Sequence, residues 1–255
     1  MEKYQAGKQN QRICLLLAVL AMFLIVVSLL LSSFQIAVYG DPKYRFYEKE
    51  YVKYEVTEAL DMKLSDVMAV TEYMMDYLIG RKEELSIETD VDGKRQDFFN
   101  EQDRLHMADV KGLFLGGLKL RTMLLLGAAL LIGILAALKA RLWEILPKAY
   151  IIAIAFFAAA LVFLGIVVSI DFTRCFRIFH EIFFTNDLWM FDESTDYMIR
   201  MLPEGFFADM VVRIVSVFVA GLVLLGGVIG LAWFFYRKKQ YKIYDKHTAC
   251  KKNMI

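Results

Sequence analysis

The chain has 255 residues, of which 58% are hydrophobic, and its formal net charge is +1. Its mean hydropathy of +0.45 is well above that of an ordinary soluble domain. A charge this close to zero creates no overall field that would attract a nucleic acid or an acidic substrate, and Cys14, Cys175 and Cys250 lie too far apart for a metal or redox motif.

Four apolar runs are long enough to cross a bilayer, because a transmembrane helix needs about 20 apolar residues. They occupy residues 13–39, 121–138, 150–170 and 214–236. The first run follows a short basic stretch, as in a signal peptide. It is longer than a typical signal core and lacks a clear cleavage site, so we interpret it as a retained anchor. The fold class predicted is an α-helical integral membrane protein with four transmembrane helices.

The placement of Lys and Arg predicts the orientation. Residues 1–12, 139–149 and 237–255 together carry thirteen Lys and Arg residues and three acidic residues. By the positive-inside rule these segments are cytoplasmic, so both termini are expected inside, the C-terminal one as a basic tail. The two remaining segments then face outward: residues 40–120, expected as a small extracytoplasmic cap, and residues 171–213.

The expected cap carries signals for a helix and a hairpin. Ser65 is a candidate N-cap, Gly80 is a candidate stop, and apolar residues recur between them at helical spacing. The pair Asp92-Gly93 separates two short segments and is typical of a tight β-hairpin turn.

A further helix is expected to begin near Asn100, whose pairing with Asp103 resembles an N-cap. This helix carries His106 towards the second span. The adjacent glycines at positions 116 and 117 are expected to bend or break it.

The histidines are the candidate functional residues. His247 falls in the basic tail and is expected to be solvated, whereas His106 and His180 each lie near a predicted membrane boundary. On a helix Asp109 shares a face with His106 and can orient its imidazole. A lone histidine at an interface is most often a structural polar partner, and aromatic neighbours are by default an interfacial belt. Two histidines beside an aromatic lining nevertheless point to a shared site.

Familiar catalytic motifs are missing. The chain has no His-Glu-x-x-His, no Gly-x-Ser-x-Gly and no phosphate-binding glycine loop, and the histidine spacing gives no specific support for zinc. The residues alone therefore predict a four-span membrane protein with an outward cap and a candidate two-histidine site.

Two blocks carry a resemblance to a known family. The first is FFNEQDRLHMADVKGLF at residues 98–114. The second comprises FHEIFF at residues 179–184, NDLW at residues 186–189 and DYMIRMLPEGFF at residues 196–207. With these blocks and the four-span plan, the chain resembles the Lit family of bacterial lipoprotein intramolecular transacylases.

The resemblance implies a substrate and a reaction. The partner would be a bacterial lipoprotein whose N-terminal cysteine carries a diacylglyceryl group, held beside membrane lipid. The sn-2 acyl chain would move to the cysteine α-amino group and leave a lyso-form lipoprotein. The family places two catalytic histidines where the cap meets the membrane, at positions that match His106 and His180. No cofactor or metal is implied, and the site would face the extracytoplasmic side of the bacterial cell membrane.

For the mechanism we hypothesise that His106 is the general base, oriented by Asp109. His180 would then stabilise the oxyanion or protonate the leaving glyceryl oxygen, and the reverse assignment stays open. Supporting donors are Arg177, Trp189 and Arg200. An aromatic lining for the acyl chains is expected from Phe114, Phe179, Phe183, Phe184 and Phe206. The competing interpretations are a membrane scaffold or assembly factor and a metal-dependent hydrolase at the outer leaflet.

Overall fold

The computed structural model describes the backbone of residues 2–252 and the side chains of residues 10–242. The side chains of His247 and Cys250 lie outside this description. The chain divides into two compact units. The span unit comprises residues 1–30, 121–162 and 218–255, and the histidine unit comprises residues 31–120 and 163–217.

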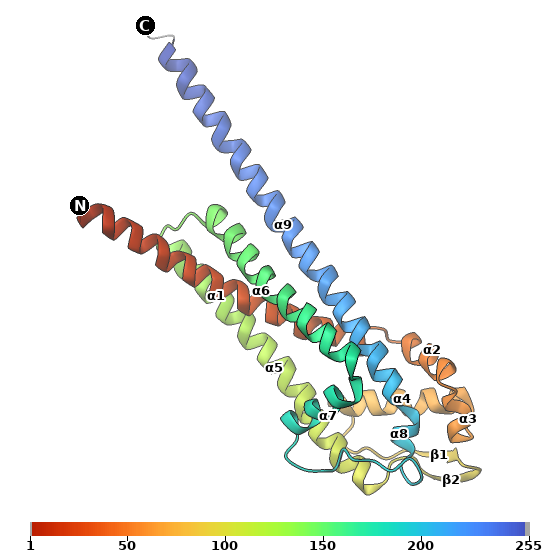
Figure 1. The fold of residues 1–255 in the computed structure, drawn as a ribbon. Coiled ribbons are helices and arrows are strands. Elements are labelled where there is room, and N and C mark those ends of the chain that lie inside the picture. The colour runs from red at the N-terminus through yellow and green to blue at the C-terminus, as the bar shows by residue number, and fades with distance from the viewer. Residues whose placement is uncertain (1, 253–255) are drawn as a thin grey trace. The chain divides into compact units, whose positions relative to one another are not determined.

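The described chain is almost entirely helical, with one β-hairpin (Figure 1). In chain order the elements are α1 (Glu2–Tyr39), α2 (Arg45–Lys53), α3 (Val56–Leu60), α4 (Leu64–Leu78), β1 (Glu88–Val91), β2 (Lys94–Asp97), α5 (Glu101–Ala137), α6 (Leu142–Ile170), α7 (Phe172–Phe183), α8 (Tyr197–Met201) and α9 (Glu204–Lys252).

Four of these helices are long and apolar enough to cross a membrane, which confirms the number of predicted spans. The candidate spans are Asn10–Tyr39, Glu101–Ala137, Leu142–Ile170 and Glu204–Lys242. Helices α5 and α9 begin well before the apolar runs from which we predicted spans, because their first turns are amphipathic and continue the same helix. The expected break at residues 116–117 is wrong. Two glycines cost about 1 kcal/mol each relative to alanine, which is too little to interrupt a 37-residue helix.

The span unit is held together by a small apolar core. Ala18 and Met22 of α1 pack with Ala149 of α6 and with Phe218 of α9. The Tyr150 hydroxyl donates to the Leu222 carbonyl at 2.7 Å and so satisfies a polar group in apolar surroundings. Many large apolar side chains on the same helices point outward, among them Met123, Leu130 and Val223. Outward apolar side chains of this kind suit a lipid environment.

The histidine unit has a separate core of aromatic and methionine side chains. Tyr51 of α2 is fully buried, and its hydroxyl hydrogen-bonds Thr71 of α4 at 2.7 Å. Helix α4 begins at Leu64 with Lys63 in the cap position, so the expected N-cap Ser65 is wrong by two residues. The expected stop at Gly80 is confirmed, because Gly80 takes a φ of +82° just beyond the helix.

The predicted hairpin is present. Strands β1 and β2 are antiparallel, with Val91 opposite Lys94. Asp92 and Gly93 form the two-residue turn with φ values of 50° and 69°, the left-handed conformation that a type I′ turn requires.

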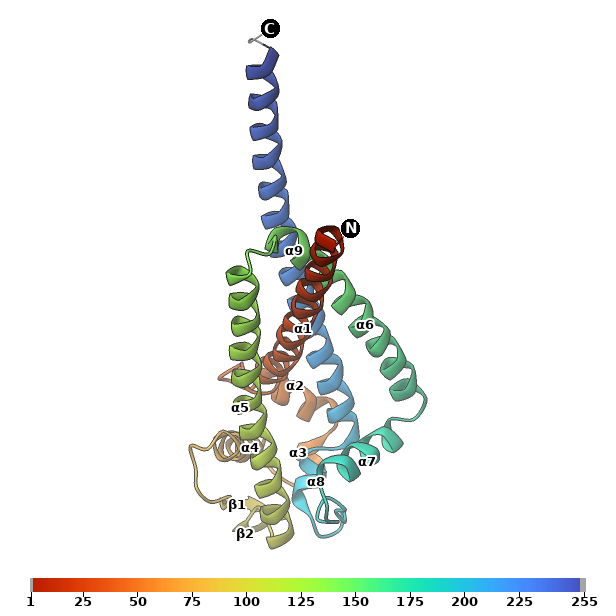
Figure 2. The same ribbon diagram turned by 90° about the vertical axis from the view of Figure 1, so that its left-hand side faces the viewer.

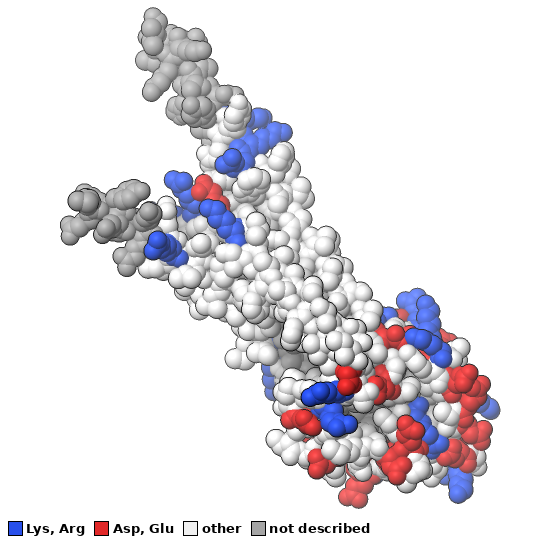
Figure 3. All heavy atoms as spheres, viewed as in Figure 1, with Lys and Arg blue, Asp and Glu red and all other residues white. Residues whose placement is uncertain are grey.

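Charged side chains are unevenly distributed over the surface (Figure 3). They are frequent over the histidine unit, whereas the middle stretches of the long helices carry almost none, and Lys and Arg gather again near the ends of these helices in the span unit. This segregation is typical of a protein whose long helices sit in lipid and whose short elements meet water.

Candidate active site

The structure brings His106 and His180 together within the histidine unit. Their ring centroids lie 6.0 Å apart and the ring planes are inclined by 29°. His106 is 5% exposed and His180 is 7% exposed. Histidine is rarely so buried without a polar role, and here two imidazoles from distant segments share one buried space.

A reciprocal cap fixes the start of the helix that carries His106. The Asp103 backbone N–H donates to Asn100 Oδ1 at 2.9 Å, and the Asn100 N–H donates to Asp103 Oδ2 at 3.0 Å. This arrangement is a capping box, and it confirms the predicted N-cap. Asn100 Nδ2 also donates to the buried Asp196, which ties the start of α5 to the segment that precedes α8.

His180 is held by its own helix. Asp171 caps α7 by accepting from the Arg174 N–H at 2.9 Å. One turn before the helix ends, His180 Nδ1 lies 2.8 Å from the Phe176 carbonyl oxygen. A carbonyl oxygen can only accept, so Nδ1 carries the proton. In the neutral ring Nε2 is then the nitrogen with a free lone pair.

Burial also sets the charge state of His180. Desolvation lowers the pKa of His180 below its ordinary value of 6.5, and the hydrogen bond to the Phe176 carbonyl opposes part of that effect. The imidazole is therefore neutral at neutral pH and available to accept a proton.

Aromatic rings surround both imidazoles. Phe184 contacts both, with its centroid 5.0 Å from that of His106 and 5.5 Å from that of His180. Phe191 lies 5.3 Å from His106, and Trp189 lies 5.0 Å from His180 at an inclination of 30°. These rings exclude water from the histidine pair.

The segment that follows α7 is fastened to the first turns of α5, as Figures 1 and 2 show in both views. Gln102 Nε2 donates to the Leu188 carbonyl at 3.1 Å and to the Met190 carbonyl at 3.0 Å. Asn186 Nδ2 donates to Asp109 Oδ2 at 2.9 Å. Side chains of one helix thereby position the loop that carries Trp189 and Phe191.

The expected pairing of Asp109 with His106 is not formed. The Asp109 carboxylate accepts from Asn186, and His106 Nδ1 is buried without a hydrogen-bond partner. The carboxylate of this short side chain accepts a hydrogen bond from the Asn186 amide of the neighbouring loop, and not from the imidazole on its own helix.

A hollow of about 300 Å³ adjoins the histidines. It is lined by Ala108, Asp109, Gly112, Leu113, Phe183, Phe184, Thr185 and Asn186. Phe184 lines this hollow and also contacts both imidazole rings, so the hollow lies beside the buried pair.

The other predicted donors lie in different settings. Arg200 donates to the Ala59 carbonyl at 3.0 Å and pairs with Asp92 at 3.0 Å, so it anchors the hairpin turn. Arg177 is exposed on α7. Trp189 alone of the three proposed donors contacts an imidazole.

The aromatic residues predicted to line the site fall into two groups. Phe179 and Phe183 are on α7 beside His180 and are about half exposed. Phe114 instead packs on Phe34 at 5.1 Å, and Phe206 is buried against Tyr47 at 5.2 Å. These last two residues belong to the core of the histidine unit.

Sequence reasoning gave no role to Gln102 or Asn186. Each is a neutral amide in a polar stretch, and its partner is a backbone carbonyl or a carboxylate on another segment. The only feature of the sequence that could have pointed to these two residues is their position inside the two blocks at residues 98–114 and 179–207.

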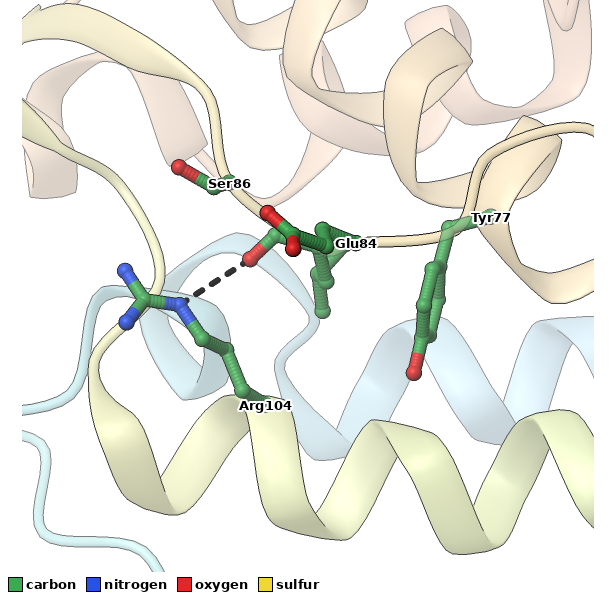
Figure 4. Close-up of a pocket in the computed structure, with 5 residues that line it drawn as sticks. Tyr77, Glu84, Ser86 and Arg104 are labelled. Atoms are coloured by element: carbon green, nitrogen blue, oxygen red, sulfur yellow. Dashed lines mark hydrogen bonds between the residues drawn. The ribbon is translucent and has the colours of Figure 1, made fainter.

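A second hollow, of about 400 Å³, lies elsewhere in the histidine unit and contains neither histidine (Figure 4). Its walls are Tyr77, Glu84, Leu85, Ser86 and Arg104. Arg104 Nε donates to the Leu85 carbonyl at 3.1 Å across it, and the same guanidinium pairs with Asp97 at 2.8 Å. Arg104 of α5 thus holds the segment before β1 and the end of β2.

Within residues 10–242 no group of three or more His, Cys, Asp or Glu side chains is arranged to hold a metal ion.

A comparison with protein families matches residues 19–207 to the model described as lipoprotein intramolecular transacylase Lit. The chain belongs to this family. The matched range contains both histidines and the hydrogen bonds described above around them. No curated protein matches the chain.

Solved structures show that the whole Lit fold is shared. The chain is similar to the membrane-integral Lit of Bacillus cereus with a histidine-to-arginine substitution, at 22% identity and a TM-score of 0.71, over 93% of this chain and 98% of that one. A histidine-to-alanine variant of the same protein gives 22% identity and a TM-score of 0.69, over 94% and 100% of the two chains. At this identity the likeness establishes the fold alone.

Proposed function

We propose that this protein is a lipoprotein intramolecular transacylase that moves the sn-2 acyl chain of a diacylglyceryl-cysteine to the cysteine α-amino group. The product is a lyso-form lipoprotein. Family membership supports the reaction class. The observation that carries the site is the pair of buried imidazoles 6.0 Å apart, enclosed by aromatic rings.

The reaction needs positioning more than it needs energy. Conversion of an ester into an amide is downhill, so the transfer requires no nucleotide. The attack of the amine nitrogen on the acyl carbon closes a ring of about eight atoms, a conformation that a flexible lipid seldom adopts. Holding the two ends together in a fixed site removes most of that entropic barrier.

The proton transfers define the two histidine roles. The α-amine has a pKa of about 7.7–8.0, and only its neutral form attacks. As the N–C bond forms, the nitrogen becomes acidic and must lose a proton. As the C–O bond breaks, the glyceryl oxygen must gain one. One base and one donor therefore balance the reaction without a further reactant.

Hydrogen bonding favours His180 as the base. Its Nδ1 proton is committed to the Phe176 carbonyl, so Nε2 presents the lone pair. His106 then donates a hydrogen bond to the oxyanion, and the imidazolium formed at His180 passes its proton to the leaving glyceryl oxygen, so that both rings end neutral. These roles reverse the hypothesis drawn from the sequence, which relied on a carboxylate at Asp109 that is bound to Asn186 instead.

Burial of the pair favours transfer to the amine over hydrolysis. Water is the competing nucleophile for any activated ester. His106 and His180 are each less than a tenth exposed, and Phe184, Trp189 and Phe191 cover them. A dry site gives the tethered amine the advantage. Imidazolium charges on both rings at this separation would repel, so at most one ring is protonated during the reaction.

The Lys and Arg distribution supports a topology with both termini in the cytoplasm and the histidine unit on the extracytoplasmic side of a bacterial cell membrane. Substrate lipoproteins are anchored in that outer leaflet, so the proposed site and substrate meet at one surface.

The test is to produce the protein beside a diacylated lipoprotein and to fragment the resulting N-terminal lipopeptide in a mass spectrometer. Transfer leaves the total mass unchanged, so only the fragments report the product. A fatty acyl group on the cysteine nitrogen supports the proposal. An unchanged diacylglyceryl peptide with a free amine, at a verified level of folded protein, would refute it.

A further inference from the structure

Helix α7 carries a large apolar face that residues 10–242 leave about half exposed or more. Ile178 and Phe179 are each 44% exposed, Ile182 is 70% exposed and Phe183 is 50% exposed. Positions separated by one, four and five residues fall on one side of an α-helix. Four large apolar side chains therefore form a single stripe.

The opposite face of α7 is charged. Arg174, Arg177 and Glu181 recur at spacings of three and four residues and are exposed. His180 lies at the border between the two faces and points into the protein. A short helix with one lipid-like face and one charged face is typical of an element that lies in a membrane interface.

The position of α7 in the chain places it at that depth. It follows α6 with only Asp171 between them, and Figure 2 shows α7 turned away from the last turns of α6, which belong to the same unit. Helix α6 has 29 residues, about 43 Å at 1.5 Å per residue, which exceeds the ~30 Å core of a bilayer. Its last turn still exposes Ile166 and Ile170. The apolar surface of the span thus continues onto α7.

The same stripe ends at the hollow beside the histidines. Phe183 belongs to the exposed face and also lines the hollow, opposite Leu113 of α5. Phe184, the next residue, lines the hollow and touches both imidazole rings. A continuous row of apolar side chains therefore leads from the surface of α7 to the histidine pair.

We propose that α7 lies along the membrane–water interface, and that the hollow between Phe183 and Leu113 is a lateral opening through which an acyl chain of the lipoprotein substrate reaches the histidines from the bilayer. This inference rests on the proposed function and adds the route and the binding surface of the chain.

The chemistry of the hollow fits a fatty acyl chain with a polar end. Leu113, Phe183 and Phe184 supply apolar walls. Asp109 and Asn186 form a polar rim at the same opening. Gly112 contributes no side chain, and a Cβ there would meet nothing within 4 Å, so the space beside it is free for a ligand.

Gly112 provides a direct test with a matched control. In Gly112→Leu a side chain is added at a residue that lines the hollow, and its Cβ meets nothing within 4 Å. Gly133→Leu makes the same change on the same helix at another exposed position where nothing lies within 4 Å. We expect Gly112→Leu to lower the initial rate of lyso-lipoprotein formation by at least about tenfold, and Gly133→Leu to leave it within about twofold. Equal rates for both variants and the wild type would overturn the route.

The depth of α7 is tested separately. In a full-length chain freed of its three cysteines, Ile182→Cys and Arg177→Cys are labelled with an environment-sensitive fluorophore in proteoliposomes. Quenching by lipids with brominated acyl chains at position 182 but not at position 177 is expected. Equal quenching would contradict the interfacial placement. This result does not depend on activity, whereas a wild-type protein that forms no lyso product would refute the proposed function itself.

Discussion

His180 Nδ1 donates to the carbonyl oxygen of Phe176 at 2.8 Å, one helical turn earlier in α7. Because this contact fixes the tautomer, the neutral ring presents the Nε2 lone pair to a substrate. His106 has no comparable partner at Nδ1. The two histidines are thus chemically unequal, although they share one aromatic enclosure.

The first prediction separates their roles. Gln can donate a hydrogen bond but cannot serve as a base near neutral pH. We expect His180→Gln to be as inactive as His180→Ala, with a loss of about 10²–10⁴ in rate. His106→Gln should recover much of the activity lost in His106→Ala, a loss of about 10²–10³.

The measurement is the initial rate with purified protein in lipid bilayers, with the thermal unfolding of each variant as the control for folding. Recovery by Gln at position 180 and none at position 106 would restore the assignment of His106 as the base.

The second prediction concerns pH. The base must be unprotonated, and burial lowers the pKa of His180 below 6.5. The neutral substrate amine already limits kcat/KM below its own pKa of about 7.7–8.0, so the acidic limb due to His180 is expected as a second, steeper fall below pH 6.5. Trp189 covers the ring at 5.0 Å. In Trp189→Ala water reaches the imidazole, the pKa rises, and the acidic limb moves to higher pH.

Trp189→Phe keeps a ring over His180 and should restore the position of the limb. Profiles of kcat/KM against pH for the three proteins make the comparison. An acidic limb that is the same in Trp189→Ala and in the wild type would show that His180 does not control it.

The third prediction tests the contact between Asp109 and Asn186. If Asp109 acts as a hydrogen-bond acceptor for the loop, Asp109→Asn should retain activity within a fewfold, because an amide oxygen also accepts. Asp109→Ala should lower the rate by about tenfold by loosening the loop that carries Trp189 and Phe191. If a negative charge beside His106 were required, Asp109→Asn would be as defective as Asp109→Ala in the same rate assay.

The fourth prediction concerns Arg200, which pairs with Asp92 and the Ala59 carbonyl. Arg200→Met should lower the unfolding temperature of the purified protein and leave the rate per folded molecule within about twofold, because the guanidinium holds the hairpin turn. Asp92→Ala is the matched variant and should behave in the same way. A selective loss of kcat in Arg200→Met at unchanged stability would return Arg200 to the active site.

Local signals in the sequence predicted several elements correctly. The Asp92-Gly93 turn, the Gly80 stop and the Asn100 cap each depend on residues within a few positions, so their chemistry is visible in the chain. The four apolar runs likewise predicted four long helices. Ser65 was a wrong cap because Lys63 is the last residue with extended backbone and the helix already begins at Leu64.

The site was predictable only in part. The two histidines were found from their rarity and from the two blocks that carry the family resemblance, but their mutual distance depends on how α7 and α5 pack. The Asp109 carboxylate binds the side-chain amide of Asn186 and not the imidazole on its own helix, and Phe206 packs in the core against Tyr47. Such contacts depend on which partners the other segments bring close in the folded chain. The spacing of residues along one helix does not contain that information.

The most direct test of intramolecular transfer at this site is a crossover experiment. Purified protein receives a mixture of two diacylglyceryl lipopeptides, one with heavy isotopes in both its peptide and its sn-2 chain and one without. The account predicts N-acylated products that are wholly heavy or wholly light, and none with His180→Ala. Products that combine a heavy peptide with a light chain, or full activity without His180, would contradict it.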